Sequence, residues 1–160
     1  YIKMYKESLL SNSNAVKISA LQALYRLDIE AASEYAASVT NDLEKESLKD
    51  ALVPIFIHDR TEKEIAFVAG NLVNGIFFSE DRNLSNAYKE GFQWVAYSDN
   101  EEATQELVNS FLTIARYKSY GGDVAAKQAL SVVLDGKKES TYANKDVLIK
   151  IVQDGLDKLN

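Results

Sequence analysis

Apolar side chains recur at steps of three and four residues along most of the chain, with polar residues between them. The clearest example lies near the centre, where one stripe carries Leu84, Ala87, Tyr88, Gly91, Phe92 and Val95. This spacing places side chains on one face of an α-helix. After the turn Ser98-Asp99-Asn100, Leu107, Phe111, Ile114 and Ala115 form an equivalent stripe. The pattern predicts two antiparallel amphipathic helices, the second running over 101–118.

The same period predicts further helices on both sides of this central pair. Upstream, a short helix over 2–10 comes first. The stripes that follow are Ile18, Leu21, Leu24 and Tyr25; Ile29, Ala32, Ala36 and Val39; Leu48, Leu52, Ile55 and Phe56; and Ile65, Val68, Leu72 and Ile76. Downstream, the stripes are Ala126, Ala129, Leu130 and Val133, and then Val147, Leu148, Ile151, Val152, Gly155 and Leu159.

Polar residues and glycines mark where these helices begin and end. Asp99 with Glu102 has the spacing of a capping box, and so have Asn41 with Glu44 and Thr61 with Glu64. We expect Gly121-Gly122 to end the helix over 101–118. We expect Asp135-Gly136 to end the next helix, and a polar loop over 137–141 to follow it.

Two local signals disturb the helical pattern. Pro54 lacks an N–H and crowds the preceding turn, which predicts a kink or an early break near Ala51. Asn74-Gly75, followed by Ile76-Phe77-Phe78, is also typical of a β-hairpin turn leading into a strand. The helical interpretation is favoured there because the upstream 3.6-residue period is long and a helix end explains the same dipeptide.

The fold class follows from the number and spacing of these helices. One proline and seven glycines in 160 residues leave little room for the frequent turns of an all-β domain. Pairing the elements gives units over 14–40, 42–78, 81–118 and 123–160, the size of a HEAT or armadillo helix pair. We therefore expect an all-α, right-handed HEAT/armadillo-like solenoid of about eight or nine antiparallel helices, forming a single domain over 1–160.

Charge and composition exclude several classes of protein. With 18 basic against 24 acidic residues, the formal net charge is −6, and no basic run suggests a nucleic-acid interface. No apolar run approaches the roughly 20 residues that span a bilayer. The absence of cysteine excludes disulfides and thiolate zinc sites but does not identify the compartment. Because the chain begins at Tyr1 rather than Met, we expect it to be a piece of a longer protein.

Catalytic and metal-binding patterns are missing from the sequence. There is no His-Glu-x-x-His, no Gly-x-Ser-x-Gly and no phosphate-binding glycine loop, so no catalytic, cofactor-binding or metal-ligating residue is predicted. His58 is the only histidine, and we interpret it as a polar residue at a helix end. The acidic clusters at Glu80-Asp81 and 99–102 lack the glycine and terminal glutamate of an EF-hand loop, and both lie at predicted helix starts.

Aromatic residues are the one group with a potential binding role. They are Tyr88, Phe92, Trp94, Tyr97, Phe111, Tyr117 and Tyr120. Such residues line a peptide groove in some solenoids and pack between helices in others. Trp94 and Tyr97 lie off the main stripe and are therefore the two of most interest.

Some of these segments resemble a known family. Ala87-Tyr88-Lys89-Glu90-Gly91-Phe92-Gln93-Trp94-Val95, the following Ser98-Asp99-Asn100, and Ala126-Lys127-Gln128-Ala129-Leu130 resemble the C-terminal helical region of bacterial zinc aminopeptidases of the aminopeptidase N (gluzincin) type. The stretch Leu24-Tyr25-Arg26-Leu27-Asp28, followed by Ile29-Glu30-Ala31-Ala32, is similar to the joints between helices in that region. The resemblance extends from about Asn14 onward.

The resemblance implies a HEAT-like solenoid that caps the peptidase domain of the same chain and limits which peptides enter its cavity. The zinc-binding His-Glu-x-x-His of the family, its downstream glutamate and its Gly-Ala-Met-Glu-Asn motif are absent. The fragment is therefore expected to be noncatalytic, with zinc implied only for the parent enzyme. The alternatives are a free-standing HEAT- or TPR-type module that binds a protein or peptide, and an all-α enzyme with carboxylate metal ligands, although the acidic residues here fall on polar faces.

Overall fold

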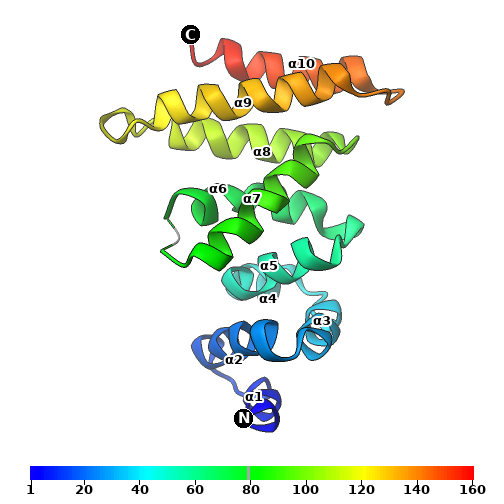
Figure 1. Cartoon of the computed structure of the whole chain (residues 1–160), viewed down its shortest axis with the longest axis vertical. Helices are drawn as coiled ribbons and strands as arrows, with labels where there is room; N and C mark the ends of the chain where they lie inside the picture. Colours follow the sequence, from blue (N-terminus) through cyan, green and yellow to red (C-terminus); the bar gives the residue numbers. More distant parts are fainter. Residues whose placement is uncertain (79) are drawn as a thin grey trace. The chain divides into compact units, whose positions relative to one another are not determined.

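The computed structural model describes residues 1–78 and 80–160. Within these ranges the chain forms ten α-helices and two short 3-10 helices, and no strand (Figure 1). The all-α prediction is confirmed. The structure has more helices than the eight or nine expected, because the segment after Asn41 forms two helices, the first of them only six residues long.

The helices form two compact units, Tyr1–Thr61 and Glu62–Asn160. Unit 1 contains α1 (Ile2–Ser8), α2 (Asn14–Leu27), α3 (Ile29–Ser38), α4 (Asp42–Ser47) and α5 (Lys49–Asp59). Unit 2 contains the 3-10 helix η1 (Glu62–Glu64), α6 (Ile65–Phe78), α7 (Arg82–Ala96), α8 (Glu101–Ile114), the 3-10 helix η2 (Lys118–Tyr120), α9 (Gly122–Glu139) and α10 (Lys145–Asp157). The expectation of one domain over the whole chain stays a prediction.

Short polar side chains cap the N-termini of α2, α3 and α4 in unit 1. The side-chain oxygen of Ser13 accepts a hydrogen bond from the N–H of Val16, and Asp28 and Asn41 do the same at the starts of α3 and α4. Such caps satisfy N–H groups that have no partner inside the helix. Asp28 also lies 3.2 Å from the Lys6 ammonium. The N–H of Ala31 and then this ammonium lower the pKa of the Asp28 carboxyl.

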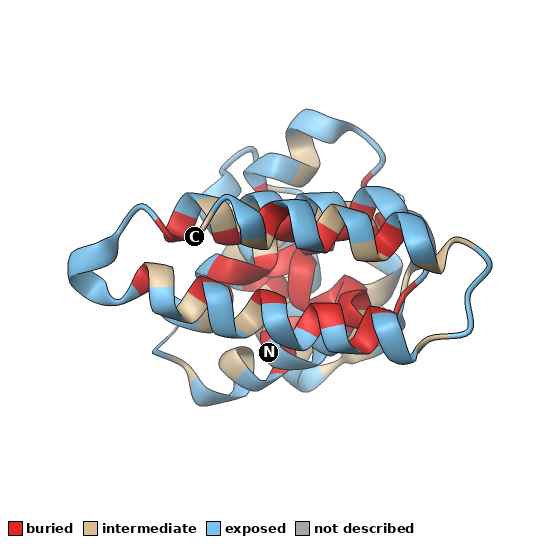
Figure 2. Cartoon of the chain, turned by 90° about the horizontal axis from the view of Figure 1, so that it is seen from above, coloured by how far each residue is buried: buried red, intermediate tan, exposed pale blue. Residues whose placement is uncertain are grey.

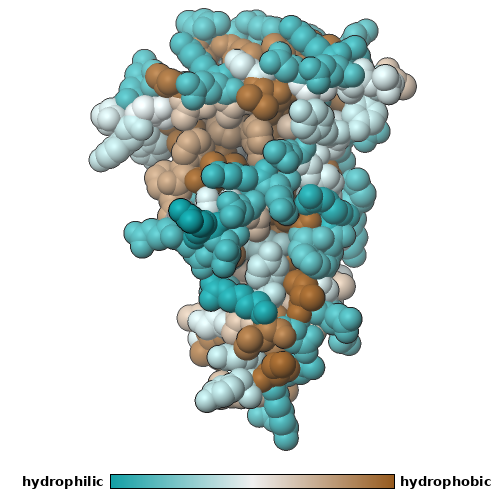
Figure 3. Space-filling model, viewed as in Figure 1, coloured by the Kyte–Doolittle hydropathy of each residue, from teal (hydrophilic) through white to brown (hydrophobic). Residues whose placement is uncertain are grey.

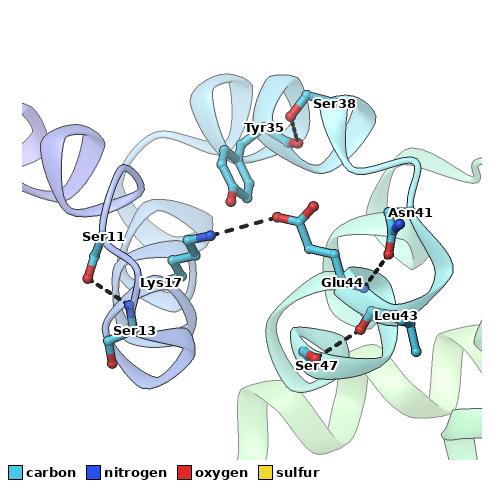
Figure 4. Close-up of polar contacts among 9 residues, drawn as sticks. All are labelled: Ser11, Ser13, Lys17, Tyr35, Ser38, Asn41, Leu43, Glu44 and Ser47. Carbon is cyan, nitrogen blue, oxygen red and sulfur yellow. Dashed lines mark hydrogen bonds and ion pairs between the residues drawn. The ribbon is translucent and has the colours of Figure 1, made fainter.

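An ion pair joins α2 to α4 within unit 1. Lys17 Nζ lies 3.8 Å from Glu44 Oε1, and the Tyr35 ring of α3 points toward the same space (Figure 4). Burial and then the negative charge of Glu44 raise the pKa of the Tyr35 hydroxyl. A second link joins α3 to α5, because Ser33 Oγ donates to Asp59 Oδ1 at 2.9 Å.

The proline of α5 does not end the helix. Residues Lys49–Asp59 are helical with Pro54 inside, and the break in the ladder lies at Leu48, three residues before the predicted position near Ala51. The N–H groups of Ala51 and Leu52 both bond to the Leu48 carbonyl. Because the break precedes α5, Pro54 lies in the second turn of a new helix, where it removes only one ladder bond.

In unit 2, each helix packs against neighbours one and two places along the chain. α6 contacts α7 and α8, α8 contacts α9 and α10, α7 contacts α9, and α9 contacts α10. The side-by-side arrangement of α8, α9 and α10 is visible in Figure 1. Buried residues lie on the helix sides that face one another, and exposed residues lie on outward sides and in connections (Figure 2).

Several helix caps and ends differ from the prediction. α8 begins at Glu101 as predicted, but its cap is Asn100, which accepts from the N–H of Ala103, rather than Asp99. It ends at Ile114, and the chain then forms η2 before reaching the left-handed Gly121 at φ 74°. α9 does not end at Asp135-Gly136 but continues to Glu139. Thr61 is likewise followed by η1 rather than directly by an α-helix.

The hairpin alternative at Asn74-Gly75 is wrong, because both residues lie inside α6. Gly75 is needed there for close packing rather than for a turn. A Cβ atom at Gly75 would overlap the ring of Tyr88, which is buried where α7 crosses α6. Gly70, one and a half turns earlier, faces only the flexible end of Glu106, whose Oε2 would lie 3.3 Å from an added Cβ.

This difference gives a matched pair of substitutions on one helix. Gly75→Ala is expected to lower the free energy of unfolding by about 1 to 3 kcal/mol, because overpacking outweighs the gain in helix propensity. Gly70→Ala is expected to be neutral or stabilising by up to about 1 kcal/mol. Urea unfolding followed by circular dichroism measures both, and equal effects of the two substitutions would contradict the packing of α6 against Tyr88.

Candidate functional site

An apolar groove opens on the surface of unit 2. Three adjacent clefts have volumes of about 300, 530 and 310 Å³. The first and second share Phe78, Ile114 and Tyr117, and the second and third share Phe77 and Ala125. The residues that line the three clefts are called the aromatic groove below, and they also include Gly70, Val73, Lys89, Phe92, Phe111, Tyr120, Ala129 and Val132. Figure 3 shows hydrophobic residues gathered at the left, below α9.

The floor of the aromatic groove is a set of three phenylalanines in edge-to-face contact. Phe111 is buried, with ring centroids 6.3 Å from Phe77 and 5.9 Å from Phe92, at interplanar angles of 86° and 85°. This geometry is favourable for aromatic pairs and fixes the ring positions. The floor is therefore formed before any ligand arrives.

The rim of the groove exposes large apolar side chains. Phe78 is 68% exposed, Tyr117 57% and Tyr120 88%. Single exposed apolar residues are ordinary, but several at one recessed place are typical of a binding surface. The groove therefore has the features of a recognition site for an apolar ligand.

Several of the aromatic residues singled out from the sequence lie in this groove. Phe92, Phe111, Tyr117 and Tyr120 belong to it, whereas Tyr88 is buried under Gly75. Trp94 and Tyr97, the two residues of most interest in the sequence, are not among the groove residues that the structure describes. Phe77 and Phe78 line the groove but were not predicted from the sequence to do so. Three consecutive apolar residues at 76–78 point about 100° apart on a helix, so they cannot all face one core.

A second unusual feature of unit 2 is a fully buried lysine. Lys137 has no exposed surface, and its Nζ donates to the carbonyl oxygens of Val95 at 2.9 Å and Ser98 at 2.6 Å. These carbonyls lie at the C-terminus of α7, where a helix leaves C=O groups without partners. The predicted polar loop over 137–141 is wrong for Lys137, because α9 continues to Glu139.

Two more side chains from the α9–α10 connection bond to the same turn. Tyr142 Oη donates to the Tyr97 carbonyl at 2.6 Å, and Asn144 Nδ2 donates to the Asp99 carbonyl at 2.8 Å. Lys137, Tyr142 and Asn144, with the carbonyls that they bind, are called the corner cluster below. It fixes the α7–α8 turn to the segment between α9 and α10.

Burial lowers the pKa of the Lys137 ammonium from 10.5 to about 8, and the negative charge of Asp99 opposes part of this decrease. The Lys137 amine donates to main-chain oxygens and has no exposed surface, so it is not open to a substrate. We therefore assign Lys137 a structural role. A buried charge held by carbonyl groups stabilises one arrangement of the two elements.

The histidine and the acidic residues considered in the sequence as metal ligands make contacts that stabilise helices. His58 lies in the last turn of α5, with Nδ1 3.0 Å from Asp59 Oδ1 and its ring in edge contact with Tyr25. Asp81 caps α7 by accepting from the N–H groups of Asn83 and Leu84. Within 1–78 and 80–160, no three or more His, Asp or Glu side chains gather in a metal-binding arrangement. No helix in these ranges is long and apolar enough to cross a bilayer.

The chain matches no protein-family model, no curated protein and no solved structure. The resemblance to the aminopeptidase N family therefore stays a prediction based on the segments at 24–32, 87–100 and 126–130.

The buried lysine predicts a specific pH dependence of stability. Between pH 8 and 10.5 the unfolded chain holds a proton on Lys137 that the folded chain has released, so this residue makes the folded state more stable as pH rises. Lys137→Met removes the titration and also the side-chain donor to the Ser98 carbonyl, whereas the Val95 carbonyl keeps the N–H and the hydroxyl of Ser98. We expect the destabilisation caused by Lys137→Met to grow by about 1 to 3 kcal/mol from pH 7 to pH 10.

Urea unfolding of both proteins at each pH measures this difference, and other titrating groups cancel in the comparison. Lys138→Met, at the exposed neighbouring position, is the matched control and should show the same effect at both pH values. A destabilisation by Lys137→Met that shrinks with rising pH would contradict the buried position of the ammonium.

Proposed function

We propose that this chain is a noncatalytic helical-repeat domain that acts through its surfaces. In the form that the resemblance supports, it is the C-terminal domain of a zinc aminopeptidase, where it caps the peptidase domain and limits peptide access. The segments that carry the resemblance at 87–95 and 126–130 belong to α7 and α9, two helices that pack against each other in unit 2.

The packing order of unit 2 is the observation that supports a helical repeat. α6, α8 and α10 form one series of contacting helices, and α7 and α9 form a second. In stacked helix pairs, each helix contacts its partner and the equivalent helix of the next pair, which gives the same order. Unit 1 has a related order, because α3 and α5 are in contact and α2 packs against both.

The noncatalytic part of the proposal is supported by the sequence motifs. Cleavage by this enzyme class depends on zinc held by His-Glu-x-x-His and a later glutamate, and the sequence has one histidine. Any turnover by the parent protein would then come from residues outside this chain.

The aromatic groove favours a second candidate function, a free-standing module that binds a protein or peptide. An exposed apolar recess of this size on a helical-repeat surface is suited to an extended or helical segment of a partner. Both candidates share the claim that the chain acts by binding rather than by chemistry.

The complete coding sequence separates the two candidates. If the chain is a capping domain, the codons before Tyr1 encode a His-Glu-x-x-His motif a few hundred residues upstream. A complete reading frame without that motif would overturn the aminopeptidase assignment and leave the binding module.

An activity measurement tests the noncatalytic claim separately. The purified chain, with zinc added, is expected to give no release of arylamine from aminoacyl-arylamide substrates above the buffer blank, because it lacks the zinc ligands of the family. A zinc aminopeptidase assayed in parallel shows that the assay works. Turnover that purifies with the chain and disappears on chelation would contradict the claim.

A further inference from the structure

We propose that the aromatic groove binds a peptide segment of a partner protein in which bulky apolar side chains alternate with carboxylates. This inference rests on the proposed function in one respect, namely that the chain acts by binding. It adds the chemical class of the ligand and the place where it binds.

The shape of the groove indicates an elongated ligand. Its three clefts follow one another from Gly70 and Val73 of α6, past Tyr117, to Val132 of α9, and neighbouring clefts share walls. A compact small molecule would fill one cleft, whereas a peptide places successive side chains into successive clefts. The rigid floor of Phe77, Phe92 and Phe111 limits the entropy lost on binding, because these rings already support one another.

The charged side chains at the groove indicate the sign of the charge that the ligand carries. Lys89 is the one charged side chain among the described residues that line the groove. Arg116 and Lys118 are exposed and flank Tyr117, which lines two of the clefts. Among the ion pairs within 1–78 and 80–160, none involves these three cations. Carboxylates beside the apolar anchors would give the cations partners and speed association.

Other ligands fit these observations less well. An anionic membrane surface contacts protruding residues and would leave the recessed floor of the groove empty, and the chain's net charge of −6 opposes its approach. A second copy of the chain carries the same net charge, which opposes self-association through this face. The net charge also opposes an acidic peptide at long range, but a peptide can enter the recessed clefts and place its carboxylates beside Lys89, Arg116 and Lys118, which a flat membrane surface cannot do.

The test uses the whole 160-residue chain and a defined probe. The probe is a fluorescein-labelled synthetic peptide of about twelve residues, in which aspartate alternates with phenylalanine or leucine. One comparison peptide has lysine at the aspartate positions, and another has alanine at the apolar positions. Fluorescence anisotropy is expected to show binding of the acidic apolar peptide about tenfold or more tighter than either comparison peptide.

Substitutions in the groove locate the binding and test its charge preference. Tyr117→Ala is expected to weaken binding of the acidic apolar peptide about tenfold, because it removes an aromatic anchor. Lys89→Glu is expected to weaken the acidic peptide and strengthen the lysine peptide, which a loss of folding would not do. Leu43→Ala and Lys3→Glu, at exposed positions of unit 1, are matched controls that should leave binding unchanged.

Four results would overturn the proposal. They are no binding of the acidic apolar peptide, equal binding of the lysine peptide, binding that Tyr117→Ala leaves unchanged, and occupation of the groove by another ligand. Occupation by a second copy would appear as dimers in light scattering, and occupation by a membrane would appear as sedimentation with phosphatidylserine vesicles. In either case Tyr117→Ala would abolish the signal. If the acidic apolar peptide does not bind and the chain shows no enzymatic turnover, the peptide proposal fails and the proposed noncatalytic function stands. Turnover by the chain, or a complete reading frame without the upstream motif, would instead contradict the proposed function and leave the peptide proposal untouched.

Discussion

Unit 2 depends on how the carbonyl groups at the C-terminus of α7 are satisfied. The last turn of any helix leaves C=O groups without internal donors, and burying them unpaired costs about 1 to 3 kcal/mol each. Here the Val95 carbonyl accepts locally from the N–H and the hydroxyl of Ser98, and the Lys137 ammonium of α9 donates to it and to the Ser98 carbonyl. Tyr142 and Asn144 donate to the carbonyls of Tyr97 and Asp99 in the same turn. A lysine on another helix thus adds to the local cap, and it holds two helical hairpins in one arrangement.

This arrangement also sets the geometry of the aromatic groove. α7 supplies Lys89 and Phe92 to the groove, and α9 supplies Ala125, Ala129 and Val132. The corner cluster joins the same two helices about one to two turns farther along, at Val95 and Lys137. Because the link is buried and charged, sliding α9 along α7 would separate the ammonium from its carbonyls. The spacing of the groove walls therefore depends on a contact outside the groove.

The helical pattern was predictable from the sequence because it depends on local periodicity. Leu107, Phe111, Leu130 and Val152, all taken from predicted stripes, are fully buried, and most helices begin within a few residues of the expected positions. The Asn41 cap is confirmed as well, and so is helix rather than strand at 76–78, although α6 does not end at Asn74-Gly75 as expected. Helix stripes and caps depend on residues within one or two helical turns of each other, so a single stretch of sequence is enough to predict them.

The features that could not be predicted depend on contacts between distant segments. Asp135-Gly136 has the composition of a helix end, yet α9 passes through it because Gly136 lets the Tyr97 ring approach, with Cε1 only 3.3 Å from where a Cβ would lie. Lys137 then points inward, although a lysine after Asp-Gly ordinarily faces solvent. The groove likewise combines α6, α8, η2 and α9, and its position follows from packing that no single stretch encodes.

A pH titration of the lysine amines by NMR, with the chain labelled with nitrogen-15 on lysine side chains, measures the central interaction directly. Lys137→Met identifies the signal of Lys137 by its disappearance. If the ammonium is buried against the α7 carbonyls, that signal titrates with a pKa of about 8. Titration at the ordinary lysine value of 10.5 would contradict the account, because it would place the amine in solvent and leave the end of α7 without its buried partner.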